Sequence, residues 1–428
     1  MRFTMRRRPG RTYGVLGLVA VLAFGALGPA GARAEERRER PARAGDVVSA
    51  EPAGFGLLPG LLTQKTDGWR ITYRSTGATG KANVVSGAVI VPKDGRKGPR
   101  PLVVFAPGTV GLADKCASSK GRLSAVSLLF DRGLRRGWGF VMTDYEGLGT
   151  KGDHTYLVGR SAGQSVLDAV RAAQRLPQAR KSGLTERSDV GIVGYSQGGH
   201  AAAWAAELHH TYAPELKVRG TAAGGVPADL ENAFAFNDGK GGAGFAMMAA
   251  VGHDAAYPGL GLERSLTKEG RRLADLARTS CSGDILAAMK GRRMHTLVDP
   301  KAAPGGRLFE RADWHAKLTA SDLGRAVPDH PVMLFQGTAD ELIPYEDVVR
   351  LHRTWSRTNP DVTFKKVPFG THASTVLFAV GPVMRWRTGR RGGAKAGPPP
   401  EHGGGGGVRA STPPLPLPST ASTRAAPR

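Results

Sequence analysis

The residue best suited to act as a nucleophile in this sequence is a serine between two glycines. Ser196 lies in Gly194-Tyr195-Ser196-Gln197-Gly198, a G-x-S-x-G motif. The apolar stretch before it predicts a strand over 189–194, and the alanine-rich stretch after it predicts a helix over 201–210. In this context the turn is so tight that only glycine fits at the outer positions, and it lifts the serine hydroxyl above the sheet. The motif therefore predicts a nucleophile at Ser196, and an ordinary strand–helix turn is the alternative.

A serine nucleophile requires a base and an acid, and they are expected downstream. A hydroxyl is weakly nucleophilic at neutral pH unless a base takes its proton, and with this motif the chain order is Ser, acid, His. Asp340 follows a predicted strand over 331–335, with the adjacent Glu341 as the alternative acid. His372 follows the last predicted strand, 362–367. We predict Asp340 as the acid and His372 as the base.

The other ten histidines lack this position after a strand. His200 lies four residues after Ser196 and is more typical of packing, whereas the remaining nine do not match the pattern: His154, His209, His210, His253, His295, His315, His330, His352 and His402. The sequence contains no His-x-x-x-His pair and no Cys/His cluster, so it predicts no metal site. It also predicts no organic cofactor.

Two backbone N–H groups are needed to stabilise the oxyanion that forms when a serine attacks a carbonyl group. One is expected from Gln197, which follows the nucleophile, and the other from the loop 106–111 after an earlier strand. In that loop we predict Thr109, within one residue. Gly108 lets the backbone approach a substrate, and we expect Gly108 and Tyr195 to contact it.

The elements that must position these residues alternate between strand and helix from about residue 65 to 380. Further strands are predicted over 70–74, 83–91, 101–106, 139–144 and 218–226, and further helices over 123–135, 165–176 and 348–355. This order predicts an α/β fold with a mostly parallel sheet and helices on both faces.

Residues 227–325 interrupt the alternation and predict a mainly helical cap inserted over the carboxyl ends of the strands, where ligands bind in such sheets. A second small domain is the alternative. Phe245, Met247 and Met248 in this segment could line an adaptable acyl site, or could simply form the core of the cap.

Both ends of the chain differ from the middle. A basic start with Arg6, Arg7, Arg8 and Arg11 precedes a 13-residue apolar run over 15–27, and a small-residue triplet ends at Ala34. This pattern predicts a signal peptide over 1–34 and a secreted protein. We expect a flexible segment over 35–54, a hydrolase core over 55–226 and 326–387, the cap between them, and a disordered low-complexity tail over 388–428. A final helix is predicted over 373–387, and we interpret residues from about 385 onward as a frameshift product or an unselected extension.

The charge and cysteine content limit the classes of function. The net charge is +24, but residues 1–34 hold six Arg and no acidic residue, and 381–428 hold eight Lys or Arg against Glu401. The remainder is mixed in sign and lacks a nucleic-acid motif, which excludes nucleic acid as the expected partner. Cys116 and Cys281 are the only cysteines. In an exported protein we expect them to form a disulfide, and two unpaired thiols are the alternative.

Several motifs in the same order resemble the secretory lipase family of fungal lipases and their actinobacterial relatives. They are the Ser196 motif extended to Gly199, the loop 107–109 with Ala-Asp-Lys-Cys over 113–116, Asp-Tyr-Glu-Gly-Leu-Gly over 144–149, and Gln-Gly-Thr-Ala-Asp over 336–340. The resemblance covers about residues 55–380. It implies an α/β-hydrolase fold with a helical cap, a triad of Ser196, Asp340 and His372, and hydrolysis of acylglycerols and simpler esters. Relatives often have His-Gly-Thr in the oxyanion loop, where this chain has Pro107-Gly108-Thr109, so a side-chain contribution there is lost.

We therefore predict a secreted serine ester hydrolase that acts on a small-molecule or lipid ester, with transient contact to a lipid interface and no obligate protein partner. The same machinery could serve a peptidase or an acyltransferase. A catalytically impaired binding protein with a hydrolase fold is the alternative from another class.

Overall fold

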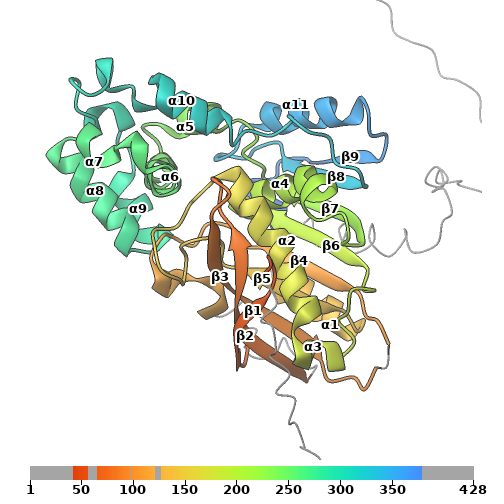
Figure 1. Ribbon diagram of the computed structural model, residues 1–428. Helices are drawn as coiled ribbons and strands as arrows, with labels where there is room; N and C mark the ends of the chain where they lie inside the picture. Colours follow the sequence, from red (N-terminus) through yellow and green to blue (C-terminus); the bar gives the residue numbers. More distant parts are fainter. Residues whose placement is uncertain (1–41, 56–64, 97, 121–126, 378–428) are drawn as a thin grey trace, which may run out of the picture. The chain divides into compact units, whose positions relative to one another are not determined.

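The computed structural model describes residues 42–55, 65–96, 98–120 and 127–377 (Figure 1). Their centre is a nine-stranded sheet in the order β1-β2-β3-β5-β4-β6-β7-β8-β9. β1 (Val47–Pro52), β2 (Thr66–Thr76) and β3 (Ala82–Pro92) are antiparallel to their neighbours. The other strands run parallel: β4 (Leu102–Ala106), β5 (Gly139–Thr143), β6 (Val190–Tyr195), β7 (Val218–Gly224), β8 (Val332–Gly337) and β9 (Val362–Val367).

Alternate side chains of the strands supply two apolar layers, one on each face of the sheet. In β4, Leu102 and Val104 pack with residues of α2 (Gly159–Arg175) and α4 (Gln197–Tyr212), and α11 (Tyr345–Ser356) extends the same layer over β8 and β9. Val103 and Phe105 point to the other face, where α1 (Ser127–Arg135) contributes Phe130. The central parallel strands β4, β5 and β8 are thus buried on both sides, which explains their continuous apolar runs. The short α3 (Pro177–Lys181) follows α2.

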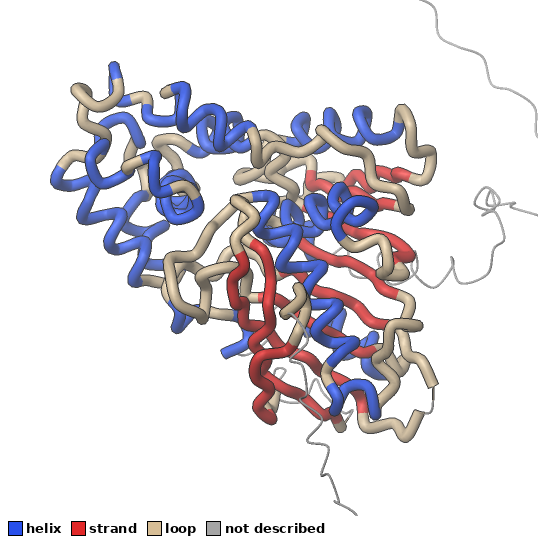
Figure 2. The backbone as a smooth tube through the Cα atoms, in the orientation of Figure 1, coloured by secondary structure: helices blue, strands red, loops and turns tan. Residues whose placement is uncertain are grey.

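A group of helices is inserted between β7 and β8. Their bounds are α5 (Leu230–Asn237), α6 (Ala243–Ala256), α7 (Leu262–Ser265), α8 (Lys268–Thr279), α9 (Ser282–Met289) and α10 (Ala312–Thr319), with short 3-10 helices at Pro258–Leu260, Met294–Leu297, Pro304–Gly306 and Leu308–Glu310. These helices lie together to one side of the sheet, in green and teal in Figure 1 and in blue in Figure 2. They enclose an apolar cluster of their own, around Met247 and Trp314.

The predicted elements agree closely with the structure, with one clear error. The last strand has the predicted bounds, and β2 is longer than the predicted 70–74. The segment 35–54 was expected to be flexible, which is wrong for residues 47–52, because they form the edge strand β1 against β2. The signal peptide over 1–34 and the tail over 388–428 lie outside the described residues.

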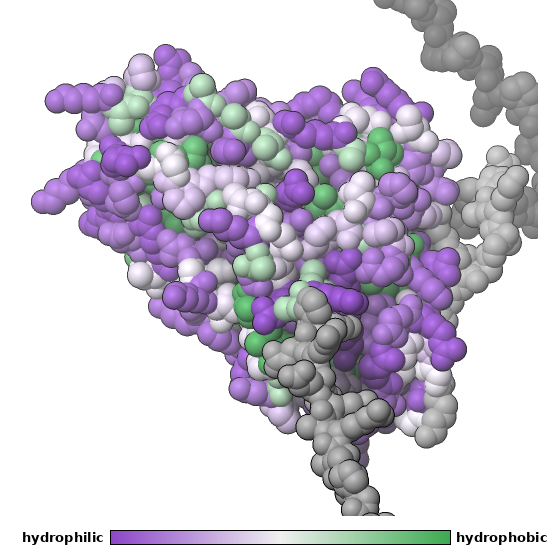
Figure 3. Space-filling view, in the orientation of Figure 1, coloured by the Kyte–Doolittle hydropathy of each residue, from purple (hydrophilic) through white to green (hydrophobic). Residues whose placement is uncertain are grey.

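The surface seen in Figure 3 is mainly hydrophilic, and its hydrophobic side chains form small separate groups. None of the described helices combines the length and the apolar character needed to cross a membrane.

Candidate active site

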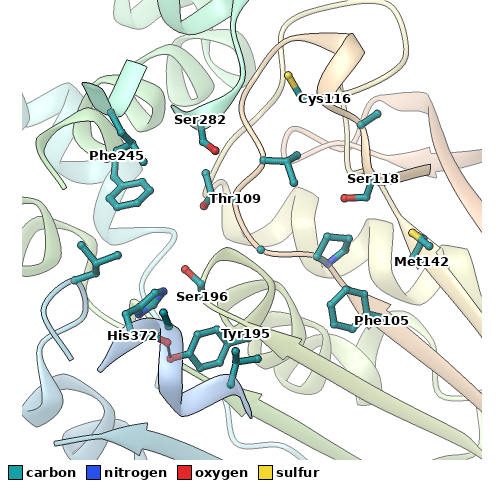
Figure 4. A pocket seen from close by; sticks show the side chains of 18 of the residues that line it. Phe105, Thr109, Cys116, Ser118, Met142, Tyr195, Ser196, Phe245, Ser282 and His372 are labelled. Carbon is teal, nitrogen blue, oxygen red and sulfur yellow. Dashed lines mark hydrogen bonds between the residues drawn. The ribbon is translucent and has the colours of Figure 1, made fainter. Parts of the chain in front are cut away.

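Ser196 occupies the sharp turn between β6 and α4. Its φ of 60° and ψ of −125° are unfavourable for a residue with a side chain. A Cβ atom at Gly194 would lie 1.9 Å from the carbonyl oxygen of Gly198, and one at Gly198 would lie 1.9 Å from that of Ala106. Glycine is therefore required at both outer positions of the motif, and the hydroxyl of Ser196 is directed into a pocket (Figure 4).

His372 and Asp340 form a hydrogen-bonded pair after the carboxyl ends of β9 and β8. The Nδ1 atom of His372 lies 3.0 and 2.9 Å from the two carboxylate oxygens of Asp340. Oδ1 of Asp340 also accepts hydrogen bonds from the N–H groups of Leu342 and Ile343, and Oδ2 accepts one from Nε2 of Gln336. Because these donors fix the carboxylate, it can fix the imidazole ring in turn.

Glu341, the alternative acid, has a different contact. Its Oε2 atom accepts a hydrogen bond of 2.9 Å from the backbone N–H of His372. The two neighbouring acids therefore contact different parts of His372: Asp340 is hydrogen-bonded to the imidazole ring, and Glu341 to the backbone N–H.

Ser196 and His372 line the same pocket and lie next to each other in Figure 4. No hydrogen bond joins the Ser196 hydroxyl to the imidazole among the contacts of the described residues. Such catalytic hydrogen bonds often tighten only when a substrate is present.

The predicted oxyanion residues flank Ser196. A Cβ atom at Gly108 would lie 3.8 Å from the Cβ of Ser196, so the loop after β4 passes directly beside the serine. Thr109 lines the pocket, and its hydroxyl shares a hydrogen bond of 2.7 Å with that of Tyr156. Gln197 is the first residue of α4, where backbone N–H groups have no partner within the helix. Both candidate donors are thus next to the serine.

The side chain of Gln197 is held by His154, a residue that the sequence analysis set aside. Nδ1 of His154 lies 2.9 Å from the carbonyl oxygen of Glu146, which can only accept, so Nδ1 carries a proton. Burial lowers the pKa of His154 to about 4, so the ring is neutral at pH 7 and its Nε2 accepts from the Gln197 amide at 3.0 Å. His154 lies eleven residues after the end of β5, so its position in the sequence gave no signal for this role.

Two tyrosines connect the loops of the site. The hydroxyl of Tyr145, whose φ is 70°, donates to the carbonyl of Pro107 at 2.7 Å. The hydroxyl of Tyr195 donates to the carbonyl of His372 at 2.6 Å. Burial raises the pKa of both phenols above the usual value, so they remain donors. Tyr195 lines the pocket as well as supporting the histidine loop.

The pocket has a volume of about 440 Å³ and is lined mainly by apolar groups, including Phe245 and Leu286 from the inserted helices (Figure 4). A narrower apolar recess also borders Ser196 and Phe245. Met247 and Met248 do not line this space, contrary to one of the two predictions for them. Both are fully buried in the cluster enclosed by the inserted helices, against which the partly buried Phe245 packs.

The predicted disulfide between Cys116 and Cys281 is confirmed. The two Cα atoms lie 5.7 Å apart, and the bond closes a loop of 165 residues. Cys116 ends the short 3-10 helix Asp114–Cys116 after the oxyanion loop, and Cys281 immediately precedes α9. The N–H of Ser282 donates to the carbonyl of Val110 beside it. The bond therefore fastens the segment that follows the predicted oxyanion loop to the inserted helices.

His200 is a packing residue, as expected. It is fully buried, its Nε2 bonds to the carbonyl of Ser321 at 2.8 Å, and burial lowers its pKa to about 4. Among the described residues, the only group of His and acidic side chains with converging ligand atoms is His209, Asp329 and His330. These residues precede or lie beside the amino ends of β7 and β8, away from the pocket.

Residues 122–398 match the family model described as secretory lipase. The chain belongs to the secretory lipase family. A secreted triacylglycerol lipase of Malassezia globosa, LIP4, is 30% identical over 75% of this chain and 72% of its own length. The probable inactive lipase MT1628 of Mycobacterium tuberculosis is 28% identical over 82% of this chain and 79% of its own length.

Solved structures show the fold of this secretory lipase. The closed state of Candida antarctica lipase A superimposes with a TM-score of 0.71 at 21% identity, over 82% of each chain. The rice cell wall degrading esterase LipA of Xanthomonas oryzae does so with a TM-score of 0.65 at 18% identity, over 80% of this chain and 96% of its own. The predicted α/β-hydrolase fold is confirmed.

Proposed function

We propose that this secretory lipase is a serine carboxylic ester hydrolase that cleaves acylglycerols or simpler esters through an acyl-enzyme. Ser196, His372 and Asp340 act as nucleophile, base and orienting acid. The observation that carries this proposal is the convergence of a strained serine and an Asp-bound imidazole on one apolar pocket, from three separate strand ends.

The hydrogen bonds of His372 define its part in the reaction. With Nδ1–H donating to Asp340, Nε2 is free of a proton and can take the one from Ser196 as its Oγ attacks the ester carbonyl. The negative charge then passes to the carbonyl oxygen, which the N–H groups of Thr109 and Gln197 stabilise. His372 gives the proton to the departing alcohol. In the second half of the reaction His372 takes a proton from water as the water attacks the acyl-enzyme, and then returns a proton to Oγ of Ser196 as the acid product leaves.

We assign the inserted helices, 227–325, as a cap over a hydrolase core formed by 47–226 and 326–387. Phe245, from the inserted helices, and the other apolar walls of the pocket suit an acyl chain better than a charged or strongly polar group. We further propose that the protein is secreted after removal of residues 1–34. The names of secreted relatives and the disulfide support this, since such bonds persist outside the cytoplasm.

An inactive protein is the competing function, because one relative is named a probable inactive lipase. In this chain the three residues that the chemistry needs are present and brought together. A fluorophosphonate probe tests the point directly, because it labels only an activated serine. Labelling of the wild type, with none in Ser196→Ala, supports the proposal, and an unlabelled wild type refutes it.

Substrate class is tested by comparing p-nitrophenyl esters of graded chain length with peptide anilides. We expect turnover of the esters and none of the anilides. A preference for anilides would identify a peptidase. Release of product that increases with an added alcohol acceptor, rather than with water alone, would identify an acyltransferase.

A further inference from the structure

At the amino ends of β7 and β8, three side chains direct metal-ligating atoms toward one point. His209 lies near the end of α4, and Asp329 and His330 immediately precede β8. One ligand atom from each lies within 4.8 Å of the others. The Nδ1 atoms of His209 and His330 approach the same oxygen of Asp329, at 2.8 and 2.9 Å.

The remaining nitrogen of each ring is bonded so that Nδ1 faces the cluster. Nε2 of His209 lies 2.9 Å from the carbonyl oxygen of Leu216, which can only accept, so Nε2 keeps its proton. Nδ1, which donates to Asp329 when no metal is bound, is the nitrogen that can lose its proton and bind a metal. Nε2 of His330 bonds to the hydroxyl of Thr221 at 2.9 Å. Metal-binding histidines characteristically engage their second nitrogen in this way, which fixes the ring.

A fourth ligand is available at the surface. His210 follows His209, its side chain is 78% exposed, and its Nδ1 lies 3.7 Å from the other oxygen of Asp329. Two imidazoles and a carboxylate, with a third imidazole or water, form a donor set that suits zinc. A tetrahedral zinc ion keeps its ligand atoms about 3.3 Å apart, so the contacts of 2.8 and 2.9 Å between Asp329 and the two Nδ1 atoms each need to lengthen by about half an ångström.

We propose that His209, Asp329 and His330 form a zinc site, with His210 or water as the fourth ligand. The site joins the end of the nucleophile helix α4 to the start of β8, the strand that precedes Asp340. Because it lies at the opposite end of the parallel strands from Ser196, bound zinc stabilises the fold and takes no part in ester hydrolysis.

The test uses the full chain, freed of metal by a chelator, loaded with zinc chloride and desalted. Bound zinc is then counted by mass spectrometry. We expect one zinc ion per wild-type chain, and none in Asp329→Asn or His330→Gln. Asp329 is partly exposed, so its variant is the one less prone to misfold, and near-UV circular dichroism verifies that it is folded.

Two controls separate this site from other zinc-binding groups. His315 pairs with Glu231 at 2.8 Å and has the same His–carboxylate contact without the converging third ligand, so His315→Gln should keep its zinc. His372→Ala should also keep it. Zinc that is absent from the wild type, retained by Asp329→Asn, or lost only in His372→Ala refutes the proposal, and the last result would identify the Asp340–His372 pair as the zinc ligand.

Thermal unfolding gives an independent measure. At a free zinc concentration about a hundred times Kd, the Tm of a protein of this size should rise by about 4 °C. The rise should be absent in Asp329→Asn and present in His315→Gln. An equal rise in both variants would contradict the assignment. None of these readouts depends on ester hydrolysis.

Discussion

Replacing Asp340 by asparagine should stop catalysis while leaving the fold intact. In the wild type Oδ1 of Asp340 accepts two backbone hydrogen bonds, from Leu342 and Ile343. The oxygen of an asparagine can keep both bonds only if its NH₂ group takes the place of Oδ2. There the NH₂ lies at the shorter of the two contacts of His372 Nδ1, 2.9 Å against 3.0 Å for the oxygen, and it favours the tautomer in which Nδ1 accepts a hydrogen bond instead of donating one.

The effect on rate follows from the proton on the imidazole. With Nδ1 accepting, the proton moves to Nε2, which can no longer take the one from Ser196. In serine hydrolases this wrong tautomer lowers kcat by about 10⁴, or about 5 kcal/mol of activation free energy. We expect a loss of that size for Asp340→Asn.

The effect on stability should be small because Gln336 can adapt. Its Nε2 donates to Oδ2 of Asp340, and its buried Oε1 has no partner among the described contacts. Rotation of the Gln336 amide by half a turn directs Oε1 to the new NH₂ group and loses only the longer bond, of 3.3 Å, from Nε2 to the carbonyl of Ile343. The free energy of unfolding should therefore change by about 1 kcal/mol or less.

Glu341→Gln is the matched control, because glutamine can still accept from the backbone N–H of His372. Steady-state kinetics on a short-chain p-nitrophenyl ester and urea unfolding should be measured for both variants. If Asp340→Asn keeps more than a tenth of kcat while Glu341→Gln loses most of it, the acid that orients His372 is Glu341 and not Asp340.

Three further outcomes are expected. Ser196→Ala and His372→Ala should each reduce ester turnover to a similar background, because the two residues act as a unit; near-normal turnover of either variant in the same kinetic assay would show that its role is misassigned. Replacement of both Cys116 and Cys281 by serine should lower the free energy of unfolding by about 3–5 kcal/mol, since the disulfide closes a long loop, and urea titrations that match the oxidised wild type would contradict this. Burial raises the pKa of Glu207 to about 7, so the folded chain keeps a proton that the unfolded chain releases near pH 4.5, and stability is lost as the pH rises through 7. The free energy of unfolding of Glu207→Gln, relative to that of the wild type, should therefore be about 2 kcal/mol higher at pH 8 than at pH 5. If urea unfolding gives the same difference between the two proteins at both pH values, the raised pKa of Glu207 is not the cause.

The arrangement around Ser196 was predictable because its determinants are local. The motif, the strand before it and the helix after it lie within some twenty residues, and the two glycines are required by contacts inside the same turn or with the adjacent strand. Asp340 and His372 were predictable because each follows a strand end in a known chain order. What the sequence alone left open was which of Asp340 and Glu341 meets the imidazole, since neighbouring side chains differ only in direction.

Residues that act through distant contacts were not predictable. The bond between His154, in a loop, and Gln197, at the start of α4, spans 43 residues, and that between His209 and Asp329 spans 120 residues. The direction of side chains on α6 was equally hidden, because the helix is apolar on most of its surface and no periodicity distinguishes Phe245 from Met247.

The contacts that hold the site in place are made by the loops that follow the carboxyl ends of the strands. Tyr145 holds the oxyanion loop by the carbonyl of Pro107, Tyr195 holds the carbonyl of His372, and the disulfide ties the end of the oxyanion loop to α9. Each brace originates from a strand end or a covalent bond, so the reacting groups can keep their positions without help from a substrate, which is what electrostatic stabilisation of an oxyanion requires. Phe245, in contrast, reaches the pocket from the inserted helices, which enclose a separate apolar cluster. Changes in substrate preference can therefore arise in those helices while the strand-end loops, and with them the chemistry, remain the same.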